Sequence, residues 1–212
     1  MNLYRKSSTS PPARLVELRD GAAVLLRPIQ PDDKQRLVDG FSRLSPESRY
    51  RRFFSAVPEL SPATVAYLTE VDHHDHEAIV ALDPALDKGL GVARYVRSVE
   101  DPASAEVAVT VADDWQGRGV GKAMLEALAD RARENGVRRF TALVQADNPS
   151  SIHLMQGLGE HRSSREGGYL ELTVELPARA GLGPAGRVLR EAARGSLVVI
   201  SRLRESASHI RT

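Results

Sequence analysis

The sequence of 212 residues contains no cysteine, few aromatic residues (5%) and no long hydrophobic run. Without cysteine, disulfides, thiolate metal sites and a cysteine nucleophile are excluded. No segment approaches the roughly 20 apolar residues of a membrane span, and the N-terminus lacks an apolar signal region. The net charge of +1 indicates no strong attraction to nucleic acid. We therefore expect a soluble, cytoplasmic protein.

The hydrophobic and charged fractions, 42% and 27%, are typical of a globular protein long enough to bury a full core. We predict a polar, flexible lead over residues 1–13 and one domain over 14–176. A basic tail follows over 177–212, with seven arginines against two glutamates. A helical pattern near 185–194 predicts an amphipathic helix that packs against the domain, a partner or an anionic surface. Alternatively, the tail is partly disordered.

The stretch over residues 104–122 carries the most information. Val107, Val109 and Val111 alternate with small residues and predict a strand. The glycine-rich run over 116–121 follows, and a helical apolar pattern comes directly after it. A strand, a glycine turn and a helix N-terminus place free N–H groups and the positive end of the helix dipole at one point. We therefore predict a site for a phosphate or pyrophosphate.

Two commoner glycine motifs do not fit this run. A P-loop would need glycine at Gln116 and a hydroxyl residue at Ala123. A dinucleotide fingerprint would need its third glycine at Lys122 or at Met124. An ordinary strand-to-helix turn remains as the alternative.

The spacing of Gln116, Gly119 and Gly121 fits the pattern Q/R-x-x-G-x-G/A. Together with the strand before it and the helix after it, this unit resembles motif A of the GNAT acyltransferases. The segment over 148–159 resembles motif B, N-x-x-A/S-x-x-x-Y-x-x-x-G, through Asn148, Ser151 and Gly159.

The motif B tyrosine is replaced here by Met155, whose thioether cannot protonate a leaving thiolate. This departure favours a mechanism that relies on a base, because a thiol of pKa about 8.5 leaves without much help.

The basic and aromatic segment over 44–54 resembles the corresponding region of bacterial Pat-type protein lysine acetyltransferases, where it commonly borders the acceptor site. Alternatively, Tyr50, Phe53 and Phe54 belong to the core and the arginines are solvated.

The resemblance covers about residues 14–176. It implies an α/β fold with a mixed sheet of about six to seven strands, two of them parallel and splayed apart, with flanking helices and acetyl-CoA in the cleft. The residues that it implies for acetyl-CoA binding are Val109, Thr110, Val111, Gln116, Gly117, Arg118, Gly119, Val120, Gly121, Lys122, Asn148 and Ser151.

The implied reaction is attack of an amine on the acetyl thioester, which needs a base because amines are mostly protonated at neutral pH. Glu106 is the predicted base, since it shares a strand face with Thr110 and Pat-like enzymes carry their catalytic glutamate in a similar A-E-V-A context. We expect a half-apolar setting for it. The alternative is an edge carboxylate paired with an arginine.

The histidine-rich run over 72–76 could be drawn as a zinc site. Consecutive loop residues rarely converge on one ion, so we predict no metal.

We therefore predict an acetyl-CoA-dependent N-acetyltransferase that acts on a protein lysine. The alternatives are a small-amine or polyamine acetyltransferase and a non-catalytic acyl-CoA sensor. The acceptor, the acyl-chain length and the oligomeric state stay open.

Overall fold

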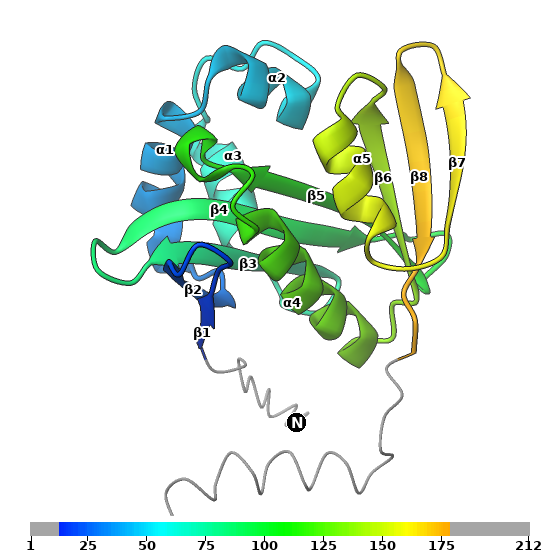
Figure 1. Ribbon diagram of the computed structural model, residues 1–212, viewed down its shortest axis with the longest axis horizontal. Helices are drawn as coiled ribbons and strands as arrows, with labels where there is room; N and C mark the ends of the chain where they lie inside the picture. The colour runs from blue at the N-terminus through cyan, green and yellow to red at the C-terminus, as the bar shows by residue number, and fades with distance from the viewer. Residues whose placement is uncertain (1–12, 179–212) are drawn as a thin grey trace, which may run out of the picture. The chain divides into compact units, whose positions relative to one another are not determined.

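The computed structural model describes residues 13–178, and one eight-stranded sheet forms its centre in the order β1-β2-β3-β4-β5-β6-β8-β7 (Figure 1). All neighbouring pairs are antiparallel except β5 and β6, which are parallel. The strands are β1 (Arg14–Glu17), β2 (Ala23–Pro28), β3 (His76–Asp83), β4 (Lys88–Arg97), β5 (Ser104–Val111), β6 (Arg139–Gln145), β7 (His161–Glu166) and β8 (Tyr169–Glu175).

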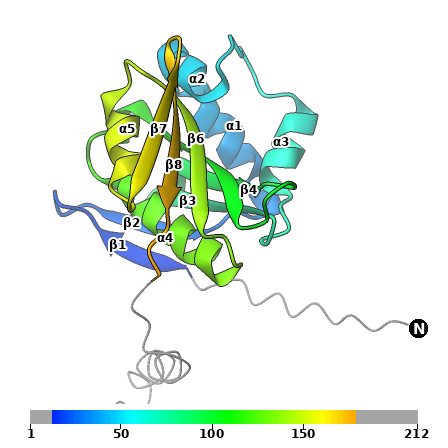
Figure 2. The ribbon, with the colours of Figure 1, turned by 90° about the vertical axis from the view of Figure 1, so that its right-hand side faces the viewer.

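Helices cover both faces of this sheet. Figure 2 shows α5 on one side of the sheet and α1 and α3 on the other, and Figure 1 shows α4 on the same side as α5. The helices are α1 (Lys34–Ser42), α2 (Pro46–Phe53), α3 (Pro62–Thr69), α4 (Val120–Glu134) and α5 (Pro149–Gln156), with short 3-10 turns at η1 (Pro31–Asp33) and η2 (Asp113–Trp115). None of the helices within residues 13–178 has the length and apolar content of a membrane span.

Burial on both faces explains the apolar run of β3. Ile79 and Ala81 pack in the larger core against α4, whereas Ala78, Val80 and Leu82 form the smaller core on the other face. A strand that is covered on both sides has no reason to alternate polar and apolar residues.

The predicted helix boundaries are confirmed by the caps. Ser45 and Ser61 each accept a hydrogen bond from the N–H group three residues on, and each precedes a proline at the first helical position. Gly136 follows α4 with φ of +85°, as a C′ glycine should.

The sheet has eight strands, one or two more than predicted. The sequence reading omitted β7, because all six of its residues are exposed and their pattern shows no apolar alternation. The mixed α/β fold itself, with its parallel crossover from β5 through α4 to β6, is confirmed. Residues 1–12 of the predicted lead (1–13) and residues 179–212 of the predicted tail (177–212), including the helical pattern near 185–194, lie outside the described residues.

Candidate active site

Strand β5 is paired along its length on one side and only at its beginning on the other. It pairs with β4 from Ala105 to Val111, but with β6 only from Ser104 to Glu106. Beyond Glu106 the two parallel strands diverge (Figure 1). The predicted splay is therefore present.

The alternation of backbone directions shows which groups of β5 the splay leaves open. The Ala112 N–H donates to the Leu90 carbonyl on β4 at 2.8 Å. Since neighbouring residues of a strand point their N–H and C=O groups to opposite sides, Val107 and Val109 direct theirs away from β4, toward the open side. The middle of the sheet thus offers an unpaired strand edge, which can bind an extended amide-bearing chain.

The predicted phosphate loop leads from β5 into α4. Gly117 and Gly119 have φ of +74° and +99°, a backbone region that glycine adopts without strain. The first ladder bond of α4 runs from the Ala123 N–H to the Gly119 carbonyl, at 3.0 Å. The N–H groups of Val120, Gly121 and Lys122 precede that bond, so they have no partner inside the helix and suit an anion.

Gly121 brings three elements together. A Cβ at this position would lie 3.3 Å from the Leu154 side chain of α5 and 3.5 Å from the Val111 side chain of β5. The absence of a side chain therefore lets the start of α4 approach both walls of the splay.

The two predicted cationic residues of this loop differ in their surroundings. The Arg118 Nε atom lies 2.6 Å from the Asp20 carboxylate, and its guanidinium stacks 3.9 Å over the Trp115 ring. The hydrogen bond from Arg118 lowers the pKa of Asp20. Lys122 is exposed and lies 3.8 Å from Glu126, so its ammonium group stays accessible to a ligand.

Gln116 shapes the turn between β5 and α4. Its amide nitrogen donates to the Val111 carbonyl (3.2 Å), to Asp113 (2.9 Å) and to Ser48 on α2 (3.2 Å). Asp113 also accepts the Ser45 N–H at 2.6 Å. These bonds anchor the N-terminus of α2 above the end of β5.

On α5, the Asn148 side chain accepts the Ser151 N–H at 3.1 Å and caps the helix. Met155, at the position of the motif B tyrosine, is 4% exposed and belongs to the main core. A buried thioether adds packing here but no proton donor.

Glu106 lies at the point where the splay begins. It pairs in register with Val96 on β4 and with Thr141 on β6. Its side chain is exposed, although apolar side chains of β4 and β6 lie on the same face of the sheet. Among residues 13–178 Glu106 forms no ion pair, although its charge interacts with the guanidinium of Arg52.

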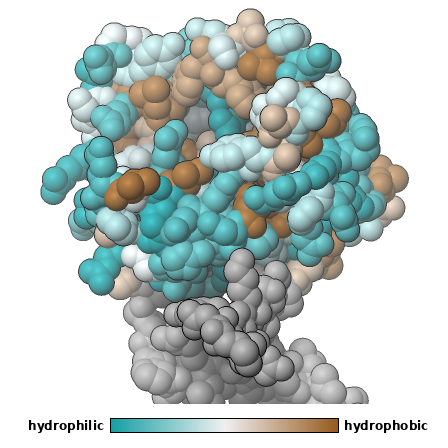
Figure 3. All heavy atoms as spheres, turned by 180° about the vertical axis from the view of Figure 1, so that it is seen from behind, coloured by the Kyte–Doolittle hydropathy of each residue, from teal (hydrophilic) through white to brown (hydrophobic). Residues whose placement is uncertain are grey.

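Exposed apolar side chains surround Glu106. Val96 lies opposite it and is 37% exposed, and Leu143, on the same face of β6 as Thr141, is 49% exposed. Tyr67 of α3 is 57% exposed, with its ring 4.9 Å from that of His76. We call Tyr67, Val96 and Leu143 the Glu106 patch. Figure 3 views the side of α1 and α3, where hydrophobic patches interrupt a mostly hydrophilic surface.

The segment over 44–54 contains both core and surface aromatic residues, and its role at the acceptor site stays a prediction. Phe53 packs edge-on against Phe41 at 5.8 Å, as a core residue does. Phe54 reaches across to Tyr169 of β8 at 5.4 Å, linking α2 to the far side of the splay. Tyr50 is 41% exposed and stays at the surface.

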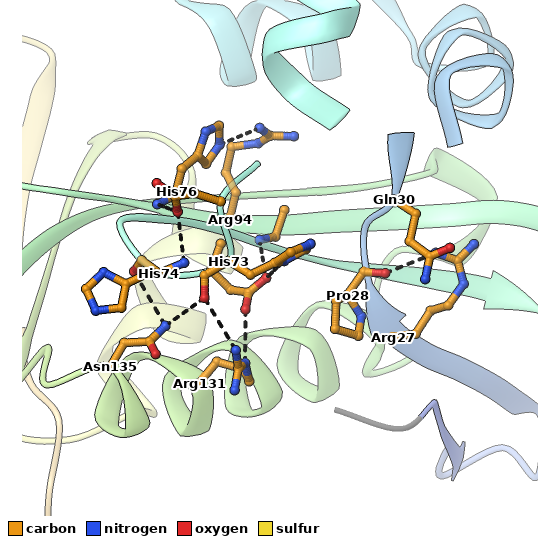
Figure 4. Close-up of polar contacts among 12 residues, drawn as sticks. Arg27, Pro28, Gln30, His73, His74, His76, Arg94, Arg131 and Asn135 are labelled. Atoms are coloured by element: carbon orange, nitrogen blue, oxygen red, sulfur yellow. Dashed lines mark hydrogen bonds and ion pairs between the residues drawn. The ribbon is translucent and has the colours of Figure 1, made fainter. Parts of the chain in front are cut away.

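The histidine-rich run forms a loop held by hydrogen bonds. Asp72 accepts the N–H groups of His74, Asp75 and His76. Arg131 of α4 and Asn135, the residue after this helix, point toward this loop (Figure 4), and the His73 carbonyl accepts a bond from Asn135 at 3.1 Å. No group of three metal-ligating side chains occurs in the part of the chain that the structure describes.

The buried carboxylate of Glu77 is the centre of this loop network. Glu77 is 0% exposed and contacts His73 Nδ1 at 2.7 Å and Arg131 Nε at 2.9 Å. These pairs join the start of β3 to the C-terminal turns of α4, far along the sheet from the phosphate loop.

Two residues near Glu106, Arg94 and Tyr67, were not predicted from the sequence, whereas Arg52 lies in the segment over 44–54 that was expected near the acceptor site. Arg94 had a visible signal, because it is a charged residue inside an otherwise apolar strand. The positions of Arg52 and Tyr67 depend on how α2 and α3 pack, and no local pattern reveals that.

Comparison with known proteins identifies the family. The profile of the Acetyltransferase (GNAT) family matches residues 43–159. The chain belongs to this family. This GNAT chain is 39% identical over 162 residues to the acetyltransferase Pat of Mycolicibacterium smegmatis, a match that spans 76% of this chain and 48% of that protein.

A second relative, an acetyltransferase of Pseudomonas aeruginosa, is 37% identical over 145 residues, which span 67% of this chain and 77% of that protein. The crystal structure of the GNAT domain of S. lividans PAT superposes with a TM-score of 0.72 at 36% identity, covering 77% of this chain and 97% of that one. The GNAT fold predicted from the two motifs is therefore confirmed.

Proposed function

We propose that this GNAT protein transfers an acetyl group from acetyl-CoA to a primary amine, with a protein lysine as acceptor and Glu106 as general base. The observation that carries this proposal is the continuous path along β5. An exposed carboxylate stands at the start of the splay, an unpaired strand edge follows, and the free N–H groups of α4 lie at its end.

The residues along this path suit acetyl-CoA. The open N–H and C=O groups of Val107 and Val109 would pair with the amide-bearing arm. The N–H groups of Val120, Gly121 and Lys122 would hold the pyrophosphate, with the Lys122 ammonium adding charge. Bound there, acetyl-CoA supplies an activated thioester at the Glu106 end of the splay.

Glu106 would remove the proton that blocks the amine. An ammonium has no lone pair, so a base must accept its proton before it can attack a carbonyl. Exposure of Glu106 lets a lysine chain reach it from solvent, and the Arg52 guanidinium lies near it. Met155 is buried and donates no proton, so the thiolate would leave unassisted.

A protein acceptor is supported by the surface around the base. The Glu106 patch exposes one tyrosine and two aliphatic side chains, which come from α3, β4 and β6. Such a patch can contact residues that flank a lysine on a folded partner, whereas a small amine would leave it uncovered. The likeness to Pat-type proteins points in the same direction.

Labelled acetyl-CoA incubated with a desalted lysate, and separately with the small-molecule fraction, tests this function. We expect label on protein lysines, reduced about 100-fold or more by Glu106→Gln because a positioned base contributes that much. Glu100→Gln, a change at an exposed glutamate in the β4–β5 loop, is the matched control and should retain activity.

Label in the small-molecule fraction alone would favour a metabolite acetyltransferase. Bound acetyl-CoA without turnover in either fraction would favour a sensor and contradict the proposal.

A further inference from the structure

A cavity of about 80 Å³ lies beneath α2, between helices α1 to α3 and the sheet face that carries Glu106. This volume has room for several water-sized groups. Thr110 of β5 lines it, so the cavity adjoins the splay. Most of the lining is apolar and includes Ile29, Leu37, Phe41, Val80, Leu90 and Val92.

Arg94 places a buried positive charge against this cavity. It is 6% exposed, and its guanidinium donates to the Leu68 carbonyl (3.1 Å) and to His76 Nε2 (3.0 Å). Neither acceptor is charged. The Leu68 acceptor is a backbone carbonyl, and burial lowers the pKa of His76 to about 4, so its imidazole is neutral. Burial also lowers the pKa of Arg94, to about 9, so it remains charged at neutral pH. Within residues 13–178 no carboxylate pairs with it.

Arg52, from α2, brings a second cation to the same cavity. Its guanidinium lies 4.9 Å from the centre of the Phe53 ring, and within the described residues it forms no ion pair. The other charged groups of the lining are already paired: Asp33 with Arg27 at 2.6 Å and with Arg36 at 3.2 Å, and Arg36 also with Asp87. The two positive charges of Arg52 and Arg94 therefore face one negative charge, that of the nearby Glu106, and one positive charge stays uncompensated.

An uncompensated charge beside an apolar cavity is costly unless an anion neutralises it. We propose that the cavity binds a carboxylate on a short aliphatic chain, with the carboxylate on Arg52 and Arg94 and the chain among the apolar side chains. Because the cavity lies beside the splay, it would take part in substrate binding, and this role rests on the proposed function. The carboxylate can come from the far end of a dicarboxylic acyl group on the donor, or from an amino-acid-like acceptor.

Thermal denaturation with butyrate, and with 1-butanol at the same concentration, tests the site without any turnover. A ligand that binds the folded state alone raises the melting temperature. We expect butyrate, and not 1-butanol, to raise it in the wild-type protein and in Arg51→Gln. Arg51 is the matched control, because it lies beside Arg52 on α2 but pairs with Glu47 outside the cavity. Arg52→Gln, checked for native circular dichroism, should abolish the shift.

The proposal is overturned if butyrate produces no shift beyond that of 1-butanol, or if Arg52→Gln retains the shift. This result is readable even if no acceptor is ever acetylated, so failure of the proposed function and failure of this site are distinguishable.

Kinetic ratios then assign the carboxylate to a substrate. The donor ratio compares kcat/KM for succinyl-CoA and butyryl-CoA, and the acceptor ratio compares leucine with 3-methylbutylamine under acetyl-CoA. We expect Arg52→Gln to lower one of these ratios about 10-fold or more, as loss of a charged hydrogen bond does, and Arg51→Gln to leave both unchanged. If Arg52→Gln changes neither ratio, the role in substrate binding is refuted.

Discussion

Replacing Gly119 by alanine tests whether the start of α4 binds the pyrophosphate. Gly119 has φ of +99°, and a Cβ there would meet no atom within 4 Å, so the cost is backbone strain of about 1–2 kcal/mol rather than a clash. Relaxation of that strain would turn the N–H groups of Val120 and Gly121 away from the ligand. Since a hydrogen bond to a charged group contributes about 1.5–3 kcal/mol, the Kd for acetyl-CoA should rise about 10- to 100-fold.

Isothermal titration of acetyl-CoA measures this Kd, and Gly136→Ala provides the control. Gly136 has φ of +85° and equally open space, but it lies at the opposite end of α4. Both variants should lose similar stability in urea, and only Gly119→Ala should lose affinity. Equal affinity in Gly119→Ala and wild type, or an equal loss in Gly136→Ala, would refute the phosphate role of this loop.

Three further predictions concern stability. Glu77→Gln removes the buried partner of Arg131 and should lower the free energy of unfolding in urea by about 3 kcal/mol; a loss below about 1 kcal/mol would contradict the network. Burial raises the pKa of Asp33, but the hydrogen bonds from Arg27 outweigh burial and hold this pKa below 3.8. The contribution of ionised Asp33 to stability is therefore complete above pH 3.8 and is lost as the pH falls through the lower pKa of the folded state. Acid unfolding should accordingly be less steep in Asp33→Asn. Met155→Tyr should overpack the core and lower stability by about 1–3 kcal/mol without raising kcat, and a rise in kcat would show that this position faces the thiol.

The elements of this fold that depend on local patterns could be predicted. The valines of β5 and the positive-φ glycines define a strand, a turn and a helix whatever surrounds them. Caps such as Ser45 and Asn148 act within three residues, so their helix starts were also readable. Strand β7 was not readable, because an exposed edge strand needs no apolar face.

The setting of Glu106 required the tertiary structure. The sequence shows a glutamate among small apolar residues, which suggests a half-buried carboxylate. Glu106 is the last residue of β5 that pairs with β6, its side chain is nevertheless exposed, and α2 brings Arg52 near it. Burial of a side chain depends on elements distant in sequence, and no window around residue 106 contains them.

The sequence alone indicated the family, and it predicted the phosphate loop and the candidate base, because each depends on residue types at short, fixed spacings. The tertiary structure decided what lies around that base: the Glu106 patch, the two arginines and the cavity beneath α2. These features come from α2, α3, β4 and β6 meeting at one end of the sheet. Such a meeting is a consequence of packing, which minimises exposed apolar area over the whole chain and is not written in any single segment.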